Sequence, residues 1–506
     1  MRGAASLSGL SFVIVVAACG SPPVPVAPAK PPQHGFFDVR AVRDVALHHR
    51  GGTRLRPRWR VTQSGARELM GVRDTQLGVD CKFRPTPSGL RCVPDPDALS
   101  TLTDTTQSFR DEACAVQVAI GFGDGASRFV VMRDATTLDC PEAPLRVFEA
   151  QSPSRVTELF GRASSGECRR SMKVGGGIDT ATRGRELTQE LVGAELVVVG
   201  FGGEGLRAAY FEAVDGAVTF SHWIDPKLDA ACSITTAADG EARCVPDGLF
   251  LSTTFADAEC STPGASTACT APRFMVKPDA RCTARAHAFH TGSSSPGDYF
   301  IGDGVACFRQ TLSSRGKKTY SPGKEIDPAF LVATPRVEDD GHAKRLRRIL
   351  VATGELRDTA PGHEPWRDTE LGVECSFWPG TDGVMRCLPS RDSSAEVEAF
   401  RDEECARPAD PVYTAPATRS GCSREAPPPP RYARSVIDDR DPSLLVEGHA
   451  RARVHRLDPW PIERPIYVKQ PQRGCVRMPI DEVASLRVEG AEVPPAAFEA
   501  GTESIE

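Results

Sequence analysis

The sequence lacks several features that would point to common classes of function. Its 61 Lys and Arg residues are outnumbered by 67 Asp and Glu residues, which gives a formal net charge of -6. A chain of this charge has no general electrostatic attraction for nucleic acid or for anionic lipid. No C-x-x-C pair occurs, so the usual zinc-ligand spacing is missing, and neither G-x-S-x-G nor H-E-x-x-H is present. We therefore predict no cofactor, no metal site, no catalytic residue and no nucleic-acid partner.

Apolar runs long enough to span a membrane are missing too. The stretch "LSFVIVVAA", residues 10–18, is too short to cross a bilayer as a helix. With Arg2 before it and small residues at its end, it is typical of a signal peptide. The tetrapeptide V-A-A-C that ends at Cys19 resembles a bacterial lipobox. That resemblance implies a lipoprotein signal peptide over residues 1–18, lipidation of Cys19 and, because Gly20 rather than Asp follows, an outer-membrane location in the cell envelope.

The segment after Cys19 is rich in proline and poor in apolar residues. It reads "GSPPVPVAPAKPPQHG" from Gly20 to Gly35. Such a sequence favours an extended polyproline conformation, which rises about 3.1 Å per residue and would reach roughly 50 Å. We predict that residues 19–44 are a lipidated tether that holds the folded body away from the membrane.

Cysteine, by contrast, is plentiful. Without Cys19, sixteen of the seventeen cysteines remain, an even number that favours disulfides in an exported chain. Four motifs recur three times in one order: D-x-x-L-x-x-x-C, R-C-x-P, F-x-D-x-x-C and G-x-E followed by an aliphatic residue. They begin at Asp74, Arg91, Phe109 and Gly184, at Asp225, Arg243, Phe255 and Gly323, and at Asp368, Arg386, Phe400 and Gly490. We define unit 1 as residues 45–201, unit 2 as 202–338 and unit 3 as 339–506.

The stretch "VVVGFGGEG" contains a formal G-x-G-x-x-G made by Gly200, Gly202 and Gly205. A dinucleotide-binding loop would be followed by a helix, whereas "LRAAYFEAV" alternates like a strand. The distance from Asp74 to Asp225 is 151 residues, and the same offset aligns Gly51-Gly52 with Gly202-Gly203. These glycines therefore mark the hinge between units 1 and 2.

Local patterns within each unit predict strands separated by turn residues. The fold class is therefore all-β, with three tandem disulfide-stapled repeats. A unit of about 150 residues is large enough for two four-stranded blades, which favours a six-bladed β-propeller. Three sandwich-like β domains are the alternative.

The first two cysteines of each unit flank a turn that contains glycine, a spacing that suits a staple across a β-hairpin. We predict the disulfides Cys81–Cys92, Cys232–Cys244 and Cys375–Cys387. One cysteine is left over in unit 1 and one in unit 3. If units 1 and 3 touch, as in a closed ring, these two can join, and Cys114–Cys475 is the hypothesis for that bond.

The lipobox, the tether and the repeated D-x-x-L-G-V-x-C, R-C-x-P and F-x-D-x-x-C motifs resemble a family of uncharacterised cysteine-rich bacterial surface lipoproteins. The resemblance covers roughly Val45 to Glu506. It brings no established activity, cofactor or catalytic residue.

Two sets of aspartates recur in the units. They are Asp74, Asp225 and Asp368, and Asp111, Asp257 and Asp402. Repeated carboxylates could hold calcium, but aspartate before a turn more often accepts hydrogen bonds from nearby backbone amides. We favour the second interpretation, and we expect Arg91, Arg243 and Arg386 each to pair with an acid inside its own unit. The pair His287 and His290 lies on an alternating segment, which would place the two rings on opposite faces of a strand.

What differs between the units is the sequence of residues 162–184, 313–324 and 423–442, which we expect to be exposed loops and candidate contact surfaces. The sequence thus predicts a lipid-anchored cell-envelope protein that acts as a non-catalytic binding or structural module. Its expected partners are the membrane, through the anchor, and a surface glycan or protein ligand. The alternative is an exported glycan hydrolase, whose paired carboxylates need no local motif.

Overall fold

The computed structural model describes residues 49–505 with gaps. The gaps are 96–100, 105–107, 122–127, 134–142, 164–165, 201–204, 252–253, 268–270, 280–284, 297–298, 303–306, 311–317, 335, 339–344, 354–355, 359–365, 390–394, 398, 408–411, 415–430, 437–450, 460–464, 471–473 and 479–486. All described residues lie in one compact part of the chain, Phe36–Glu506.

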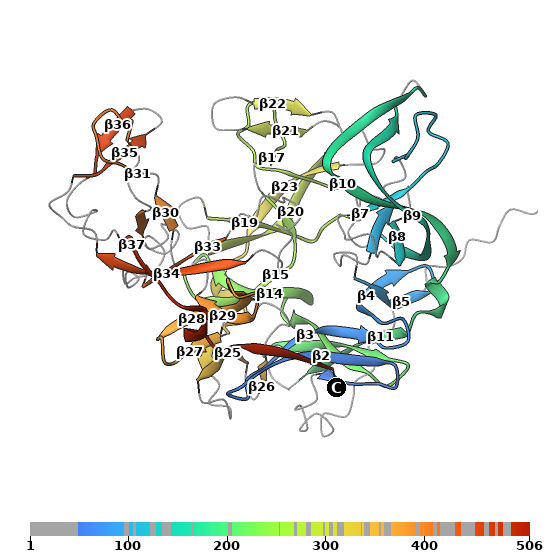
Figure 1. The fold of residues 1–506 in the computed structure, drawn as a ribbon, viewed down its shortest axis with the longest axis horizontal. Coiled ribbons are helices and arrows are strands. Elements are labelled where there is room, and N and C mark those ends of the chain that lie inside the picture. The colour runs from blue at the N-terminus through green and yellow to red at the C-terminus, as the bar shows by residue number, and fades with distance from the viewer. Residues whose placement is uncertain are drawn as a thin grey trace, which may run out of the picture. The chain divides into compact units, whose positions relative to one another are not determined.

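The all-β prediction is confirmed: the described residues form strands and short 3-10 helices, with no α-helix among them. Each unit opens with a four-stranded antiparallel meander (Figure 1). The strands are β2 (Leu55–Thr62), β3 (Arg67–Asp74), β4 (Val79–Thr86) and β5 (Gly89–Pro94) in unit 1, β12 (Arg207–Ala213), β13 (Val218–Asp225), β14 (Ala230–Ala237) and β15 (Ala242–Pro246) in unit 2, and β25 (Leu346–Thr353), β27 (Trp366–Asp368), β28 (Val373–Pro379) and β29 (Met385–Pro389) in unit 3. Buried and less buried residues alternate along much of β4 and β28, as expected for a sheet with one covered face.

The second half of each unit holds a longer hairpin and shorter strands. In unit 1, five strands pair in a closed order: β6 (Thr101–Asp104), β7 (Ala119–Gly121), β8 (Phe129–Arg133), β9 (Leu145–Arg162) and β10 (Cys168–Glu186). Unit 2 has β16 (Leu249–Phe250), β17 (Thr254–Phe255), β18 (Ala265–Thr267), β19 (Phe274–Pro278), β20 (Arg285–Pro296), β21 (Tyr299–Gly302), β22 (Cys307–Gln310) and β23 (Lys318–Glu325). Unit 3 has β30 (Ala395–Val397), β31 (Ala399–Phe400), β32 (Val412–Thr414), β33 (Tyr432–Val436), β34 (Ala452–Pro459), β35 (Tyr467–Gln470), β36 (Gly474–Arg477) and β37 (Arg487–Glu492). Two short strands, β1 (His49–Arg50) and β26 (Leu356–Asp358), pair with β13 and β25.

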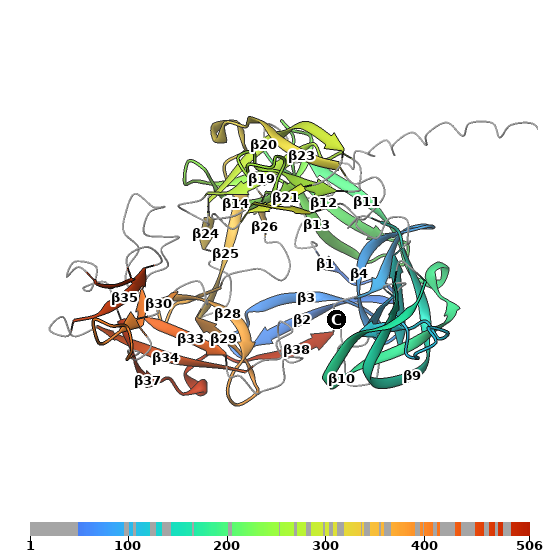
Figure 2. The same ribbon diagram turned by 90° about the horizontal axis from the view of Figure 1, so that it is seen from above.

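Each unit ends with a 3-10 helix and a strand that pairs with the first strand of another unit. The helices are η2 (Thr188–Glu190), η3 (Pro328–Phe330) and η6 (Pro495–Ala497), and the strands are β11 (Gly193–Gly200), β24 (Arg336–Glu338) and β38 (Gly501–Ile505). β11 pairs with β12, and β24 pairs with β25. β38, at the end of the chain, pairs with β2 of unit 1, and Figure 2 shows the two strands side by side. We call these three pairings joints; together they run from unit 1 to 2, from 2 to 3 and from 3 back to 1.

The three joints share one register. Leu196 lies opposite Phe211 in the first joint, Arg336 opposite Val351 in the second and Glu503 opposite Arg60 in the third. These pairs occupy equivalent positions, because Arg60, Phe211 and Val351 each lie five residues after the buried leucine at the start of their meander: Leu55, Leu206 and Leu346. The same closing strands, or the residues just before them, also pair with the last strand of their own meander. There Gly193, Ala333 and Ala500 lie opposite Arg91, Arg243 and Arg386. The closure between units 3 and 1 is therefore built in the same way as the other two joints.

The core of each meander surrounds its hairpin disulfide. Leu55, Leu206 and Leu346, at the start of the three meanders, are at most 1% exposed, and full burial of a leucine stabilises a fold by about 2 kcal/mol. In units 1 and 2, the turn between the first two strands packs into the core of the unit that precedes it in the cycle. Ala217 of unit 2 lies in the cluster of Leu55, Cys81, Phe83 and Cys92, and Ala66 of unit 1 lies in that of Leu346, Trp366, Cys375 and Phe377. Apolar contact thus follows the same cyclic order as strand pairing.

The strand pairing links these units more closely than separate domains would require. One path of hydrogen-bonded strands runs through the meanders of units 1 and 2 and ends at β38. The six-bladed propeller and the three sandwich-like domains both stay predictions. Within the part of the chain that the structure describes, no helix has the length and apolar character to cross a membrane.

Candidate functional site

The structure joins the cysteines on the last hairpin of each meander, which is β4–β5, β14–β15 or β28–β29. The bonds are Cys81–Cys92, Cys232–Cys244 and Cys375–Cys387. All six residues are at most 4% exposed, so each bond lies inside a meander core and holds two neighbouring strands together. Closing a loop of this length is worth about 3 kcal/mol. Cys19, the predicted lipidation site, lies outside the described residues.

The hypothesis of a Cys114–Cys475 bond is wrong. Cys114 pairs with Cys168 inside unit 1, and Cys405 pairs with Cys475 inside unit 3. Cys260–Cys307 is the equivalent bond of unit 2. The reason is local: the turn that carries the first cysteine packs against a strand of the same unit. Units 1 and 3 do touch, but through β2 and β38. The cysteines left over in the outer units are Cys140 and Cys422, which lie outside the described residues, as do Cys269 and Cys282.

These second disulfides hold three equivalent structures that we call the stapled tips. Each consists of an F-x-D-x-x-C turn and the strand pair that carries its partner cysteine: the ends of β9 and β10 in unit 1, β21 and β22 in unit 2, and β35 and β36 in unit 3. The motif phenylalanine pairs with an aromatic residue in the backbone of this hairpin: Phe109 with Phe160, Phe255 with Phe300, and Phe400 with Tyr467. Sequence reasoning missed this partner, although an aromatic residue seven or eight positions before the second cysteine recurs in all three units.

The aspartate of each stapled tip holds the turn closed. The carboxylate of Asp111 accepts hydrogen bonds from the amides of Ala115 and Val116, at 2.9 and 2.6 Å. Asp257 accepts from Ser261 and Thr262, and Asp402 from Ala406 and Arg407, in the same pattern. The motif cysteine adopts a left-handed backbone, with φ of 50° or 51° in all three units. This conformation is unfavourable for a residue with a side chain, and the two aspartate bonds and the disulfide support it.

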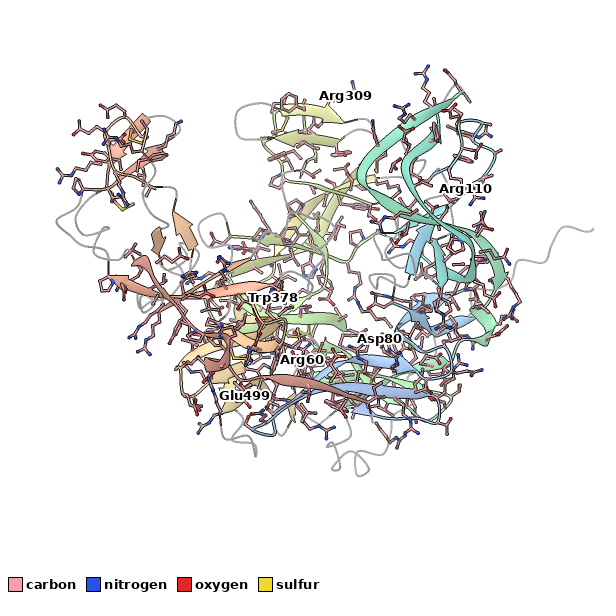
Figure 3. All side chains as sticks on the ribbon, viewed as in Figure 1. Arg60, Asp80, Arg110, Arg309, Trp378 and Glu499 are labelled. Carbon is pink, nitrogen blue, oxygen red and sulfur yellow. A yellow bond between two sulfur atoms is a disulfide. The ribbon has the colours of Figure 1, made fainter. Side chains whose placement is uncertain are left out.

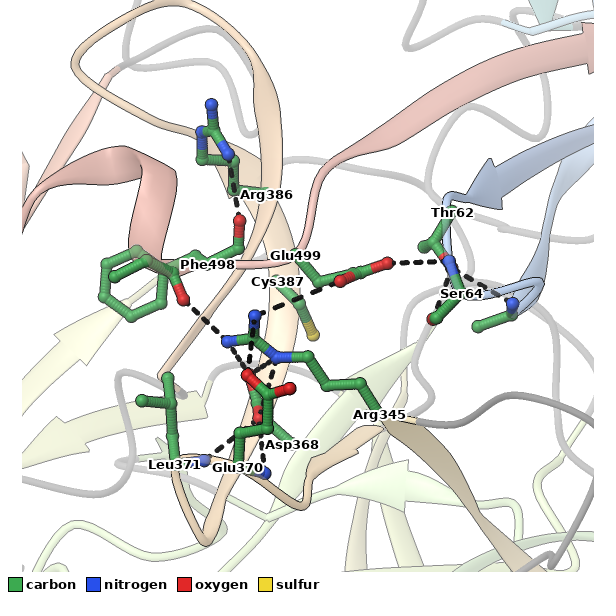
Figure 4. A network of polar contacts seen from close by, with 12 residues as sticks. Thr62, Ser64, Arg345, Asp368, Glu370, Leu371, Arg386, Cys387, Phe498 and Glu499 are labelled. Carbon is green, nitrogen blue, oxygen red and sulfur yellow. Dashed lines mark hydrogen bonds and ion pairs between the residues drawn. The ribbon is translucent and has the colours of Figure 1, made fainter.

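The other recurring aspartate is fully buried beneath the turn between the second and third strands of its meander. Asp74 and Asp368 are both 0% exposed, and both accept backbone amides two and three residues further on. Each carboxylate also receives a bidentate pair of hydrogen bonds from an arginine, Arg54 or Arg345, at 2.6 to 3.1 Å. Figure 4 shows Arg345 between Asp368 and the chain segment that precedes β38. The same arginine lies 4.0 Å from Glu499, so it ties the turn to the start of the closing strand.

Unit 2 departs from this arrangement at two positions. Gly205 stands where units 1 and 3 have arginine, and Pro226 stands where they have Thr75 and Thr369. Asp225 is still 0% exposed and still accepts the amides of Lys227 and Leu228. The turn therefore forms through its backbone hydrogen bonds, and the arginine is an addition made in the two units that meet at the closing joint.

The recurring arginines connect each meander to the 3-10 segment near the end of its unit. Arg91, Arg243 and Arg386 donate to the carbonyl oxygens of Leu191, Leu331 and Phe498, at 2.9 to 3.0 Å. The expected acid partner is present in two units, as Asp239 and Asp382, each 2.7 Å away. It is not found in unit 1, where Arg91 donates to the carbonyl of Ser88 instead. The prediction of an acid partner is wrong there because position 88 is serine.

Both sets of aspartates thus accept hydrogen bonds from backbone amides. The described residues hold no group of three or more His, Cys, Asp and Glu that could bind a metal ion. His287 lies between two carboxylates, with Nδ1 2.6 Å from Glu325 and Nε2 3.5 Å from Asp279. The ring of His290 packs instead against Phe274. The two histidines therefore have separate partners.

The segments that differ between units are less irregular than expected. Residues 168–186 form β10, residues 318–325 form β23 and residues 432–436 form β33, so the expectation of loops is wrong for these parts. The reason is that each segment continues a hairpin whose other strand supplies hydrogen bonds. Residues 164–165, 313–317, 423–430 and 437–442 lie outside the described residues. The first four residues of the glycine-rich stretch, Val197 to Gly200, belong to β11, and β12 follows two residues after Gly205. Residues 201–204 lie outside the described residues.

The stapled tips of units 1 and 2 carry exposed side chains that differ between the two units. Unit 1 carries Arg169, Arg170 and Met172 just beyond Cys168, and Met172 is 44% exposed. Unit 2 carries Phe308, 53% exposed, and Arg309 beyond Cys307. Figure 3 labels Arg309 here and Arg110 in the tip of unit 1. A rigid backbone with variable, exposed side chains suits contact with a ligand.

One comparison with known proteins finds a match. A family of unknown function, DUF7481, matches residues 197–435, from β11 to β33. No curated protein and no solved structure matches the chain.

The hydrogen bonds to Asp257 predict a pH-dependent stability. Those from Thr262 and Ser261 lower the pKa of this carboxyl from 3.8 to about 2. Because the folded-state pKa is lowered, the stabilisation is fully present above pH 3.8 and is lost as the pH falls toward 2. We expect Asp257→Asn to be less stable than wild type at pH 7 and the difference to shrink below pH 4, as measured by urea unfolding over this range.

Glu259→Gln, in the same exposed turn, is the matched control and should leave the stability unchanged at both ends of the range. A deficit of Asp257→Asn that stays constant down to pH 2 would show that the charge of the carboxylate plays no part.

Proposed function

We propose that this protein is a lipid-anchored component of the cell envelope that acts as a non-catalytic binding or structural module. The observation that carries the proposal is the use of the recurring polar residues. In each unit, the motif aspartates accept hydrogen bonds from backbone amides and the motif arginine donates to a backbone carbonyl. Residues used in this way stabilise a scaffold, and the side chains left to vary are those of the stapled tips.

Two features support a location in the cell envelope: the disulfides of the folded units and the lipobox at Cys19. The six described disulfides suit an oxidising compartment outside the cytosol. The resemblance to a lipobox implies that Cys19 carries the lipid anchor. The proline-rich segment that follows it would hold the folded units away from the outer membrane. The likeness to cysteine-rich bacterial surface lipoproteins belongs to the same proposal.

We place ligand contact at the stapled tips. Their backbones are fixed by a disulfide and by a bonded aspartate, so little conformational entropy is lost when a ligand binds. Unit 2 offers an exposed aromatic side chain, Phe308, and a cationic one on the next residue of β22, Arg309. Aromatic rings are suited to stacking on sugar rings, and both residue types are common in protein contacts. The proposed ligand is therefore a surface glycan or an envelope protein.

The anchor is tested by a single substitution. Cys19→Ala removes the only thiol at the lipobox, so we expect the protein to move from the membrane fraction to the soluble envelope fraction and to lose incorporation of labelled fatty acid. Ser21→Ala, two residues further on, is the control and should leave both properties unchanged. Retention of Cys19→Ala in membranes, with fatty acid still attached, would contradict lipidation at this site.

The ligand is tested with the purified body of the protein, residues 36–506. A glycan array and a pull-down with envelope proteins should yield a ligand that is recovered intact, and Phe308→Ala with Arg309→Ala should weaken its binding by at least tenfold, about 1.4 kcal/mol. Phe250→Ala, another exposed phenylalanine in unit 2, is the control and should bind as wild type does. Hydrolase assays run on the same glycans separate the alternative: steady turnover of a bound glycan would favour an exported glycan hydrolase.

A further inference from the structure

The joint between β38 and β2 is the only one of the three whose strands are not connected in sequence. Residues 201–206 link β11 to β12, and residues 339–345 link β24 to β25. β38 and β2 come from opposite ends of the described chain, yet they share the register of the other joints. The six described disulfides each lie within one unit, so none of them crosses this joint.

The side chains inside this joint differ in kind from those of the first joint. Between units 1 and 2, Phe211 packs on Phe83, with ring centroids 4.9 Å apart. The equivalent of Phe211 at the closing joint is Arg60, whose guanidinium lies 4.9 Å from the ring of Phe377. A cation over an aromatic ring thus replaces an aromatic pair.

The arginine at the closing joint brings a buried counter-ion with it. Arg60 pairs with Glu68 at 2.6 Å, and their side chains are only 4% and 9% exposed. Burial raises the pKa of Glu68 and lowers the pKa of Arg60, because both charges are removed from water. In unit 2 the position of Glu68 is Thr219, so the first joint contains no such pair. A buried ion pair often contributes less to stability than apolar side chains of the same size, although it specifies partner and register.

The remaining contacts of β38 are mainly backbone and polar. The strand pairs with β2 from Gly501 to Ile505, and Ile505 is 51% exposed. Glu503 forms an ion pair with Arg58 at 3.1 Å, and Thr502 donates to the carbonyl of Val61. Just before the strand, Glu499 accepts the amide of Ser64. Opening the joint would therefore break mainly backbone and polar contacts of β38, would uncover the part of the unit 3 core that Ala66 fills, and would leave β2 with an unpaired edge of defined register.

We propose that this joint is an exchange site, at which β2 of one copy of the chain accepts β38 of a second copy. Because the two copies are identical, the strand from the partner meets the same register, the same ion pairs and the same core around Phe377. Exchange of identical elements is a low-cost route to association, and an open sheet edge is a natural acceptor for a strand. The closed form is favoured in dilute solution because its two strands belong to one chain, so exchange becomes visible at high protein concentration.

The test mixes light and heavy-isotope copies of the chain. Arg58→Lys places an amine beside Glu503, with which Arg58 forms an ion pair, so that a carbodiimide can join the two residues by an amide bond. The copies are mixed at high concentration in urea that loosens the fold, without reductant, and the urea is then removed. We expect a dimer fraction in which about half of the joined peptides pair a light with a heavy chain, whereas the monomer fraction holds only unmixed peptides.

Two outcomes would overturn the proposal. One is the absence of dimer at every urea and protein concentration. The other is a dimer whose joined peptides all come from one chain, which would show association through a different surface. If Arg58→Lys does not fold, native mass spectrometry of the unmodified chains reports light–heavy dimers in its place.

A matched variant tests whether the buried ion pair of Arg60 and Glu68 controls exchange at the closing joint. Arg60→Phe with Glu68→Thr copies Phe211 and Thr219 of the first joint into the closing joint. Replacing the buried ion pair should strengthen the closed form and slow exchange by at least about tenfold. Exchange as fast as in wild type, in a variant that unfolds at the same urea concentration or a higher one, would show that the ion pair does not control the joint.

Discussion

The structure depends on one constraint: the last strand of each unit completes the sheet of another unit. β11 covers the edge of β12, β24 covers β25 and β38 covers β2. No meander is therefore complete without its neighbour, which is the condition under which repeats stabilise one another. The turn alanines Ala217 and Ala66 follow the same rule, since each fills the core of the preceding unit. Strand pairing and apolar packing thus depend on the same order of units.

The polar residues that recur in the sequence strengthen this arrangement at its weak points. Arg54 and Arg345 neutralise buried aspartates in units 1 and 3, the two units that meet without a connecting segment. Arg345 also contacts Glu499, which in turn holds Ser64 at the tip of the first hairpin of unit 1. Unit 2 is connected on both sides, and it has Gly205 in place of the arginine. Of the two arginines, Arg345 reaches the segment before the closing strand, whereas Arg54 donates to the carbonyl of Glu190, just before β11.

Much of the fold could be predicted from the sequence because its information is local. A cysteine on each side of a short glycine turn defines a hairpin staple, and alternating residues define strands. The Cys114–Cys475 hypothesis failed because each F-x-D-x-x-C turn meets its partner cysteine through contacts that are distant in sequence. Phe109 and Phe400 pair with strands 50 or more residues away, and these strands bring Cys168 and Cys475 to the turns. The pairing of β38 with β2 leaves no local signal either, since it unites Leu55–Thr62 with Gly501–Ile505. The candidate contact surface could be placed in variable segments, but not on rigid tips, since the aromatic partners of the motif phenylalanines were not recognised.

The central claim is that the three joints are equivalent, and a circular permutant tests it most directly. The chain would begin at Gly203, run to Glu506, continue through a Gly/Ser linker into His49 and end at Gly202. If the joints are equivalent, connecting the third one and opening the first should give a protein with the same disulfide pairs and a Tm within about 5 °C of the chain that starts at His49. A permutant that fails to form Cys81–Cys92 and Cys375–Cys387, or that unfolds without cooperativity, would contradict the equivalence.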